Sequence, residues 1–315
     1  VSLISPLNNT FTSIADVTFN ASFTEDIALK NSTLYLWNST FSLINTTSRN
    51  ITGTSNTTSI LLTLPYQGRF YWNYLAFDDN GNGAFNSTNF TLFYDSTQPS
   101  VSIIQPQNNG KYSTVQTELN YTVSDLGSGM FNCWYSLNNG VANTTITCGN
   151  NVTGLNSGQG NSTWKVYSND SAGNVNSTNA TFSVDSVSPN VQFVFPSNNS
   201  GFTTRNITLN YTVSDLNLQA CWYTNSSGIV NSTVTCGQNI SRVWNEGINN
   251  VTVYSNDTFN NINSSSVTFN VDSISPNVQF VFPSNNSLFI TKNITLNYTV
   301  SDLNLQACWY TNSSG

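Results

Sequence analysis

Residues 206–214 read NITLNYTVS, and this stretch decides the fold class. Apolar side chains occupy every second position, at Ile207, Leu209, Tyr211 and Val213. Polar residues fill the positions between them, namely Asn206, Thr208, Asn210 and Thr212. An extended strand with this sequence therefore has one apolar face and one polar face, which is typical of a half-buried β-strand.

Similar alternation recurs in NNVTVYS at 249–255 and in SVTFNVD at 266–272. Asn, Gly and Ser turns divide these runs at spacings of about 8–12 residues, a pattern typical of an antiparallel β-sandwich. We predict an all-β fold that needs no helix, with seven strands between residues 188 and 274. The predicted strands lie near residues 191–195, 206–213, 219–225, 230–236, 239–244, 249–255 and 265–272.

A tandem repeat surrounds the opening stretch. Residues 188–228 recur at 275–315, a shift of 87, and the two copies differ at only three positions. The differences are Gly201 against Leu288, Thr203 against Ile290, and Arg205 against Lys292. A fixed period of this size is typical of an array in which each unit is one small domain.

Prolines at equivalent points divide the chain into units: Pro6, Pro106, Pro196 and Pro283. We predict repeat 1 at 1–97, repeat 2 at 98–187, repeat 3 at 188–274 and a partial repeat 4 at 275–315. Repeat 4 would hold only the first three strands of a sandwich, so we expect the chain to continue. The connectors are short and contain proline, which predicts stiff links between sandwiches.

The run GQGNSTWKVYSNDSAGNVNSTNATFSVDSVSPNV, at 158–191, resembles the end of the immunoglobulin-like repeats of large archaeal and bacterial surface proteins. Those units close with a D-x-x-G-N turn, a last strand, an Asp, and a Pro that opens the next unit. The segments at 133–140 (CWYSLNNG) and 70–95 fit the same pattern. The resemblance implies an Ig-like sandwich at a cell surface, but no activity. Repeat 1 departs from it, because it has no cysteine and a longer middle.

The composition is unusual for a folded protein. Only 7% of residues are charged, against about 25% in an ordinary globular domain. The eight Lys and Arg residues form no basic patch, so we do not expect nucleic acid as a partner. No apolar run approaches the roughly 18–20 residues of a membrane span, so we expect no membrane insertion within these residues. With 13% aromatic residues the chain can still build cores.

N-glycosylation sequons are abundant, with about 29 Asn-x-Ser/Thr triplets. Shuffling the same composition would give roughly half as many, so the excess favours covalent N-glycans. Glycans on polar strand faces cost no core packing and would replace charge as the solubilising layer. We predict glycans at Asn120, Asn179, Asn206, Asn210, Asn231, Asn250, Asn293 and Asn297.

The cysteines predict disulfides. Cys133 and Cys148 are 15 residues apart, as are Cys221 and Cys236, and each pair is nearly symmetric about a turn. Zinc is the rival interpretation, but it needs four ligands and the chain has no histidine. Disulfides imply an oxidising, extracytoplasmic location. Cys308 repeats Cys221, and we expect its partner to lie past residue 315.

Acidic residues are few, and their positions predict clusters at the junctions between repeats. The loops after the second and sixth strands of a sandwich lie at the same pole as the incoming connector. Three carboxylates with backbone carbonyls would supply the roughly six to eight oxygens that calcium prefers. The other interpretation is that these aspartates cap turns, and we expect it to hold. The candidate residues are Asp95, Asp125, Asp170, Asp185, Asp215 and Asp257.

No group of residues predicts catalysis. The chain lacks histidine, and its cysteines are expected to be paired, so no nucleophile meets a base. Asp78 and Asp79 stand in a Gly/Asn turn without a partner acid. A carbohydrate platform at Cys221-Trp222-Tyr223 is an alternative, but a Trp on the third strand of a sandwich is more often core. We therefore predict that the protein is not an enzyme and holds no cofactor besides its glycans.

The leading interpretation is a structural, extracellular protein: a glycan-coated array of Ig-like sandwiches forming a fibre, a stalk or a surface layer. Its partners would be neighbouring repeats or chains. The alternative is the stalk of a surface adhesin whose binding tip lies outside these residues, and a weaker one is the spacer of a secreted enzyme. The near-identity of repeats 3 and 4 favours the first, since repeats that give reach or strength are copied freely.

Overall fold

The computed structural model describes residues 1–225 and 228–312, and the regular structure of these residues is β-strand throughout. The predicted all-β fold class is therefore confirmed. The chain forms two compact units, Val1–Ser186 and Val187–Gly315. In the part of the chain that the structure describes, no helix is long and apolar enough to cross a membrane.

Repeat 1 consists of two sheets that enclose one apolar core. The smaller sheet has the order β1-β3-β6, with β1 (Ser2–Ser5), β3 (Asp16–Thr24) and β6 (Ser55–Thr63). The larger sheet has the order β2-β9-β7-β4-β5, with β8 beside β7. Its strands are β2 (Thr10–Thr12), β4 (Leu29–Asn38), β5 (Leu43–Asn50), β7 (Gly68–Asp78), β8 (Gly83–Phe85) and β9 (Phe90–Tyr94).

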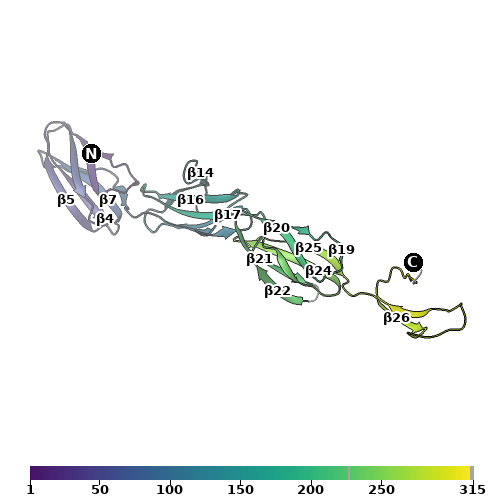
Figure 1. Ribbon diagram of the computed structural model, residues 1–315. Coiled ribbons are helices and arrows are strands. Elements are labelled where there is room, and N and C mark those ends of the chain that lie inside the picture. Colours follow the sequence, from purple (N-terminus) through teal and green to yellow (C-terminus); the bar gives the residue numbers. More distant parts are fainter. Residues whose placement is uncertain (226–227, 313–315) are drawn as a thin grey trace. The chain divides into compact units, whose positions relative to one another are not determined.

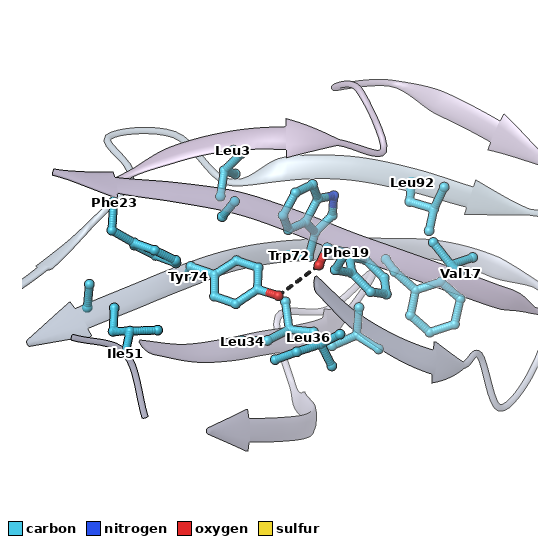
Figure 2. Packing of buried hydrophobic residues seen from close by; sticks show 14 of the residues in the cluster. Leu3, Val17, Phe19, Phe23, Leu34, Leu36, Ile51, Trp72, Tyr74 and Leu92 are labelled. Atoms are coloured by element: carbon cyan, nitrogen blue, oxygen red, sulfur yellow. Dashed lines mark hydrogen bonds between the residues drawn. The ribbon is translucent and has the colours of Figure 1, made fainter. Parts of the chain in front are cut away.

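The core of repeat 1 is built on aromatic side chains from both sheets (Figure 2). Trp72 of β7 is fully buried and lies edge-on to Phe19 of β3, with ring centroids 5.2 Å apart. The hydroxyl of Tyr74 donates a hydrogen bond of 2.9 Å to the carbonyl oxygen of Phe19. Burial raises the pKa of Tyr74 well above its ordinary value, so the phenol stays protonated and remains a donor.

Repeat 2 has the same two-sheet plan around a core that contains Trp164 and Phe182. One sheet has the order β10-β12-β15, with β10 (Ser100–Gln105), β12 (Glu118–Ser124) and β15 (Val152–Thr153). The other has the order β11-β17-β16-β13-β14. Its strands are β11 (Lys111–Tyr112), β13 (Met130–Ser136), β14 (Thr144–Ile146), β16 (Gly160–Asp170) and β17 (Val175–Val184).

Repeat 3 folds as the opening stretch predicts (Figure 1). The small sheet has the order β18-β20-β23, with β18 (Asn190–Phe195), β20 (Asn206–Ser214) and β23 (Ile240–Val243). The large sheet has the order β19-β25-β24-β21-β22. Its strands are β19 (Ser200–Phe202), β21 (Leu218–Asn225), β22 (Gly228–Val234), β24 (Gly247–Asp257) and β25 (Ile262–Val271). Every predicted strand overlaps one of these, and only β19 lacks a predicted counterpart.

The Pro-x-Asn-Asn motif moves the chain from one sheet to the other. After it, β2, β11 and β19 each pair in parallel with the last long strand of their repeat. The second asparagine adopts a positive φ in each repeat, 65° at Asn199, a conformation that asparagine tolerates better than most residues. The first accepts a backbone hydrogen bond from the last strand, 2.9 Å from Thr268 N to Asn198 Oδ1. This explains why the motif recurs.

Repeat 4 differs from the prediction in its strand content. Its described residues form a single hairpin of β26 (Asn277–Phe282) and β27 (Asn297–Ser301). Residues 305–312, which correspond to β21, were predicted as a third strand and form none. The reason is that β21 is held between β22 and β24 in repeat 3, and residues 275–312 include no counterpart of either.

Candidate functional site

Both predicted disulfides are present. Cys133–Cys148 and Cys221–Cys236 each have a Cα–Cα distance of 5.1 Å and a sequence separation of 15. Cys133 and Cys221 are buried, on β13 and β21. The sulfurs bond to each other, so the zinc interpretation does not apply to these four residues. Cys308 is a free, exposed thiol.

The predicted glycosylation residues all lie outside the cores. Asn179, Asn206, Asn231, Asn250, Asn293 and Asn297 are exposed, and Asn120 and Asn210 are half-buried. On β20 the neighbouring Ile207, Leu209 and Tyr211 point inward and are at most 4% exposed. Asn206 and Asn210 therefore stand on the opposite face of that strand, about 13–14 Å apart.

One sequon occupies the same structural position in every repeat. Each sequon asparagine lies on β3, β12, β20 or β27. It is paired with the residue that follows the bulge in the neighbouring first strand of its repeat, which is β1, β10, β18 or β26. The pairs are Ser5 with Asn20, Gln105 with Asn120, Phe195 with Asn210, and Phe282 with Asn297. Sequence reasoning named three of these asparagines and missed Asn20. Its signal was the Asn-Ala-Ser triplet in the DVTFNASFT strand of repeat 1.

Two other sequon asparagines have their amide groups tied to the backbone. Asn176 Nδ2 donates to the carbonyl oxygen of Pro99 at 2.7 Å, and Asn263 Nδ2 donates to that of Pro189 at 2.9 Å. Each amide oxygen also accepts a hydrogen bond from the next backbone N–H. These side chains fasten the start of a repeat to its last strand, and a glycan on Nδ2 would compete with that contact.

Three of the candidate acids converge within the first unit. One carboxylate oxygen each of Asp95, Asp125 and Asp170 lies within 4.8 Å of the others. Asp95 and Asp170 are each only 1% exposed, and Asp125 is half-buried. The residues follow β9, follow β12 and end β16, which are the positions that the sequence predicted.

Hydrogen bonds account for most of the oxygens in this cluster. Asp95 Oδ1 accepts from Thr97 N at 3.0 Å, and Asp95 Oδ2 accepts from Ser128 N at 2.6 Å. Burial raises the pKa of Asp95, but the hydrogen bonds outweigh it and hold the pKa below its ordinary value. The loop that holds Ser128 can approach Asp95 this closely because Gly127 has no side chain. A Cβ added at Gly127 would lie only 2.1 Å from Asp95 Oδ2.

Asp170 closes a turn. Its Oδ1 accepts from Asn174 N at 2.8 Å and its Oδ2 from Asn174 Nδ2 at 2.7 Å. The same Asp-to-Asn pair recurs as Asp78 with Asn82 in repeat 1 and as Asp257 with Asn261 in repeat 3. In repeat 1 the same Asp–Asn pair closes a turn that is not part of any predicted acidic cluster. The need to close the turn is therefore sufficient to explain an aspartate at position 170.

Asp125 is the exception. Its Oδ2 accepts hydrogen bonds from the N–H groups of Gly127 and Gly129, at 3.1 and 2.6 Å. Its Oδ1 is buried and has no hydrogen-bond partner. That atom would suit a cation, whereas the other carboxylate oxygens of the cluster already accept N–H groups. The fit to calcium is therefore partial, and the turn-and-cap interpretation accounts for more of the geometry.

The remaining candidate acids show turn and backbone contacts. Asp185 lies at the end of the first unit, where its N–H donates to Tyr112 O at 3.0 Å. Asp215 and Asp257 belong to the second unit. Asp215 Oδ1 accepts from Asn217 N at 2.6 Å, and Asp257 Oδ1 accepts from Phe259 N at 2.8 Å.

We expect that chelation leaves the thermal unfolding of the protein unchanged. A calcium site filled at a hundredfold excess over its Kd would add about 2.7 kcal/mol, and chelation would then lower Tm by several degrees. Differential scanning calorimetry with EGTA and with added calcium measures this. A calcium-dependent rise in Tm that disappears in Asp125→Asn would contradict the expectation, since Asn keeps an oxygen for the Gly127 and Gly129 N–H groups.

The prediction that Trp222 belongs to the core is wrong. Trp222 is half-buried on the outer face of β21 and stacks on Tyr254, with centroids 5.6 Å apart and planes 3° apart. Trp134 and Tyr167 form the same pair in repeat 2, at 5.4 Å and 9°. The inward positions next to Trp222 are taken by Cys221 and Tyr223, which are 1% and 7% exposed.

No family model and no curated protein matches the chain. Among solved structures, the chain is similar to a tetra-tandem repeat from the extending region of a large adhesion protein. That likeness has 19% identity and a TM-score of 0.37, and it covers 89% of this chain and 76% of that chain. The fibronectin(III)-like modules of Clostridium thermocellum CbhA are also similar, with 14% identity and a TM-score of 0.37, over 58% of this chain and 93% of that one.

Human CDH23 EC21-23 is a third similar structure, with 14% identity, a TM-score of 0.37, and coverage of 85% of this chain and 99% of that chain. At these TM-scores the likenesses carry no argument about function. The assignment of tandem β-sandwiches rests on the strand order and the separate cores of repeats 1, 2 and 3.

Proposed function

We propose that the protein is a structural, extracellular array of Ig-like sandwiches that carries N-glycans on its outer strand faces and serves as fibre, stalk or surface-layer material. The observation that carries the proposal is the sequon in the same register of all four repeats, at Asn20, Asn120, Asn210 and Asn297. Because this sequon recurs once in each repeat at an equivalent position, glycosylation there would place a glycan on the same strand face of every repeat.

The low charge and the disulfides support the same proposal. With only 7% charged residues, the outer faces of the sheets are rich in Asn, Ser and Thr, and glycans there would keep the array soluble. Two disulfides that each close a hairpin are stable in an oxidising, extracytoplasmic compartment. The role is mechanical rather than enzymatic, and the proposed partners are neighbouring repeats or further copies of the chain.

We expect glycans on most molecules at Asn206, Asn210, Asn293 and Asn297, and bare side chains at Asn176 and Asn263. Asn206, Asn210 and Asn297 stand on polar strand faces, and Asn293 is exposed in the segment before β27. Asn176 and Asn263, by contrast, hold the incoming connector through Nδ2. Glycopeptide mass spectrometry of the protein from its source measures occupancy at each position.

Matched variants separate the glycan from the side chain that carries it. Thr212→Val removes the sequon of Asn210 and keeps the asparagine, and Ser265→Ala does the same for Asn263. We expect Thr212→Val to remove one glycan mass and Ser265→Ala to remove none. Unmodified asparagine at Asn206, Asn210, Asn293 and Asn297 would overturn the proposed glycan coat and leave the low charge unexplained.

A further inference from the structure

The outer face of the large sheet in repeat 1 carries a patch of aromatic side chains. The inward residues of β4 are buried, and the residues between them face outward. Tyr35 and Trp37 stack there with ring centroids 5.5 Å apart, and Phe85 of β8 lies 5.3 Å from Tyr35. Tyr71 of β7 pairs with Trp37, and Phe41 stacks on Tyr71 at 4.2 Å. Because Phe41 is 58% and Phe85 45% exposed, the patch is open to solvent at these two rings.

Phe41 stands at a backbone position that disfavours a bulky side chain. Its φ is 60°, in the left-handed region, where a bulky residue is a genuine outlier. At every other non-glycine position with a positive φ in residues 1–225 and 228–312, the residue is asparagine. Phe41 stacks on Tyr71 on one side and is otherwise exposed. A strained backbone position that holds an exposed ring indicates a function for that ring.

The turn that holds Phe41 also contains an N-glycosylation sequon, Asn38-Ser39-Thr40. The backbone N–H of Phe41 donates to the carbonyl oxygen of Asn38 at 3.0 Å, which closes a four-residue β-turn. The Cα atoms of Asn38 and Phe41 are therefore less than about 7 Å apart. Because an N-linked glycan begins at the asparagine Nδ2, the first sugar of a glycan on Asn38 is within reach of the Phe41 ring.

The amide group of Asn38 leaves its nitrogen available for a glycan. Oδ1 accepts hydrogen bonds from Thr40 N at 3.0 Å, Thr40 Oγ1 at 2.8 Å and Ser42 N at 2.8 Å. Nδ2 donates no hydrogen bond within the part of the chain that the structure describes, and it is not buried. By contrast, the sequon asparagines Asn56 and Asn86 donate from Nδ2 to backbone carbonyl oxygens at 3.1 and 2.8 Å. The turn and a glycan would therefore use different atoms of Asn38.

We propose that Asn38 is glycosylated and that the apolar face of its first sugar packs on the open side of the Phe41 ring. The inference rests on the proposed glycan coat, and it adds an intramolecular binding site for one glycan. The C–H groups on one face of a sugar ring carry a small positive charge, which suits the negative face of an aromatic ring. A glycan suits this site better than a second copy of the chain, because attachment in the same turn gives it a high effective concentration at Phe41.

Glycopeptide mass spectrometry and hydroxyl-radical labelling of the full chain from its source test the two parts of the proposal. We expect a glycan at Asn38 on most molecules. We also expect the Phe41 ring to be oxidised several-fold more slowly than in Thr40→Val, which lacks the sequon. Thr40→Ser keeps the sequon and is the matched control, in which the ring of glycosylated molecules should stay protected. Phe85 is the internal reference, because its oxidation should be the same in all three proteins.

A double-mutant cycle measures whether the sugar and the ring act together. Thr40→Val removes the glycan, and Phe41→Asn removes the ring but tolerates the left-handed backbone. In the glycosylated protein we expect Thr40→Val to lower the folding equilibrium constant of repeat 1 about fivefold, and to lose this effect when Phe41→Asn is present. The same variants from a host without N-glycosylation give the contribution of the Thr40 hydroxyl, which is subtracted. Phe11→Gln, at another exposed ring of repeat 1, should leave the effect intact. Hydrogen exchange at the amides of β7 in denaturant is the readout.

The outcomes separate this inference from the proposed function. Unmodified Asn38 in a protein with glycans at Asn206 and Asn210 would overturn the inference and leave the proposed coat standing, whereas unmodified asparagine at all three would overturn both. With Asn38 glycosylated, equal oxidation of Phe41 in Thr40→Val, or a stability loss that does not depend on Phe41, would contradict the packing. Protection of Phe41 that rises with protein concentration would also contradict it, since a second copy would then cover the ring. Protection that needs the sequon, with a stability loss that needs Phe41, supports the proposal.

Discussion

Replacing Trp244 by alanine is expected to destabilise repeat 3 by about 3–5 kcal/mol, enough to unfold a marginally stable domain. The indole is only 1% exposed and lies edge-on to Phe269, with centroids 5.4 Å apart. Its Nε1 donates to the carbonyl oxygen of Ile207. Truncation would leave a cavity between the sheets and a buried carbonyl without its donor, and both effects act in the same direction.

Trp222→Ala is the matched control within the same repeat. Trp222 is half-buried on the outer face and stacks on Tyr254, so its loss removes a cross-strand aromatic pair worth about 0.5–1.5 kcal/mol and some partly buried area. The free energy of unfolding of each variant is measured by chemical denaturation, with hydrogen exchange at the amides of β24 as the readout. This readout does not depend on tryptophan fluorescence. A larger loss of stability for Trp222→Ala than for Trp244→Ala would contradict the assignment of Trp244 to the core and of Trp222 to the outer face.

The placement of these two tryptophans shows where sequence reasoning succeeds and where it fails. The alternation in residues 206–214 assigns faces without ambiguity, because polar and apolar residues take turns. Cys221, Trp222 and Tyr223 are three apolar residues in a row, so periodicity cannot say which of them points inward. The disulfide decides: Cys221 must face Cys236, which turns Trp222 outward and leaves the core position to Trp244.

The two errors in the strand prediction have a common cause: both segments depend on pairing with residues far along the chain. β19 has three residues and is a strand only because it pairs with β25, some seventy residues further on. Residues 305–312 have the same sequence as the whole of β21 and form no strand, because the strands that flank β21 are contributed by residues 228–257. In both cases local sequence is secondary to the presence of the partner.

The acids and sequons were predictable in part. Residue order in a sandwich predicts that Asp95, Asp125 and Asp170 converge, and they do. What the sequence does not reveal is that backbone N–H groups already occupy most of their oxygens, since those contacts depend on loop geometry. Likewise, nothing in the triplets distinguishes Asn263, which holds Pro189, from Asn210 on an open strand face.

Removing the two disulfides is expected to destabilise repeat 3 by about 3 kcal/mol and repeat 2 by more than that, and to leave the stability of repeat 1 unchanged. Each bridge closes a loop with a sequence separation of 15, and the chain-entropy estimate for a loop of that length gives this value. The variants are Cys133→Ser with Cys148→Ser, and Cys221→Ser with Cys236→Ser. Hydrogen exchange resolved by peptide measures the stability of each repeat in the full chain.

Repeat 1 is the internal control because its equivalent edge hairpin is held together without a disulfide. Its equivalent hairpin, β4 with β5, is paired from Asn31–Asn50 to Trp37–Leu43. In repeat 2, β14 spans only Thr144–Ile146 and pairs with β13 at three positions. The short hairpin makes few ladder hydrogen bonds, so the bridge replaces strand length as the element that fixes this edge of the sheet.

Repeat 2 should therefore lose more than repeat 3 when its bridge is removed. β22 of repeat 3 runs over Gly228–Val234, and its longer pairing with β21 keeps part of the edge in place after reduction. We expect exchange at residues 144–146 to approach that of an unfolded loop, while residues 231–234 keep measurable protection. Equal losses in both repeats would mean that the bridges act only on the unfolded chain, and a loss in repeat 1 would show that the repeats do not unfold independently.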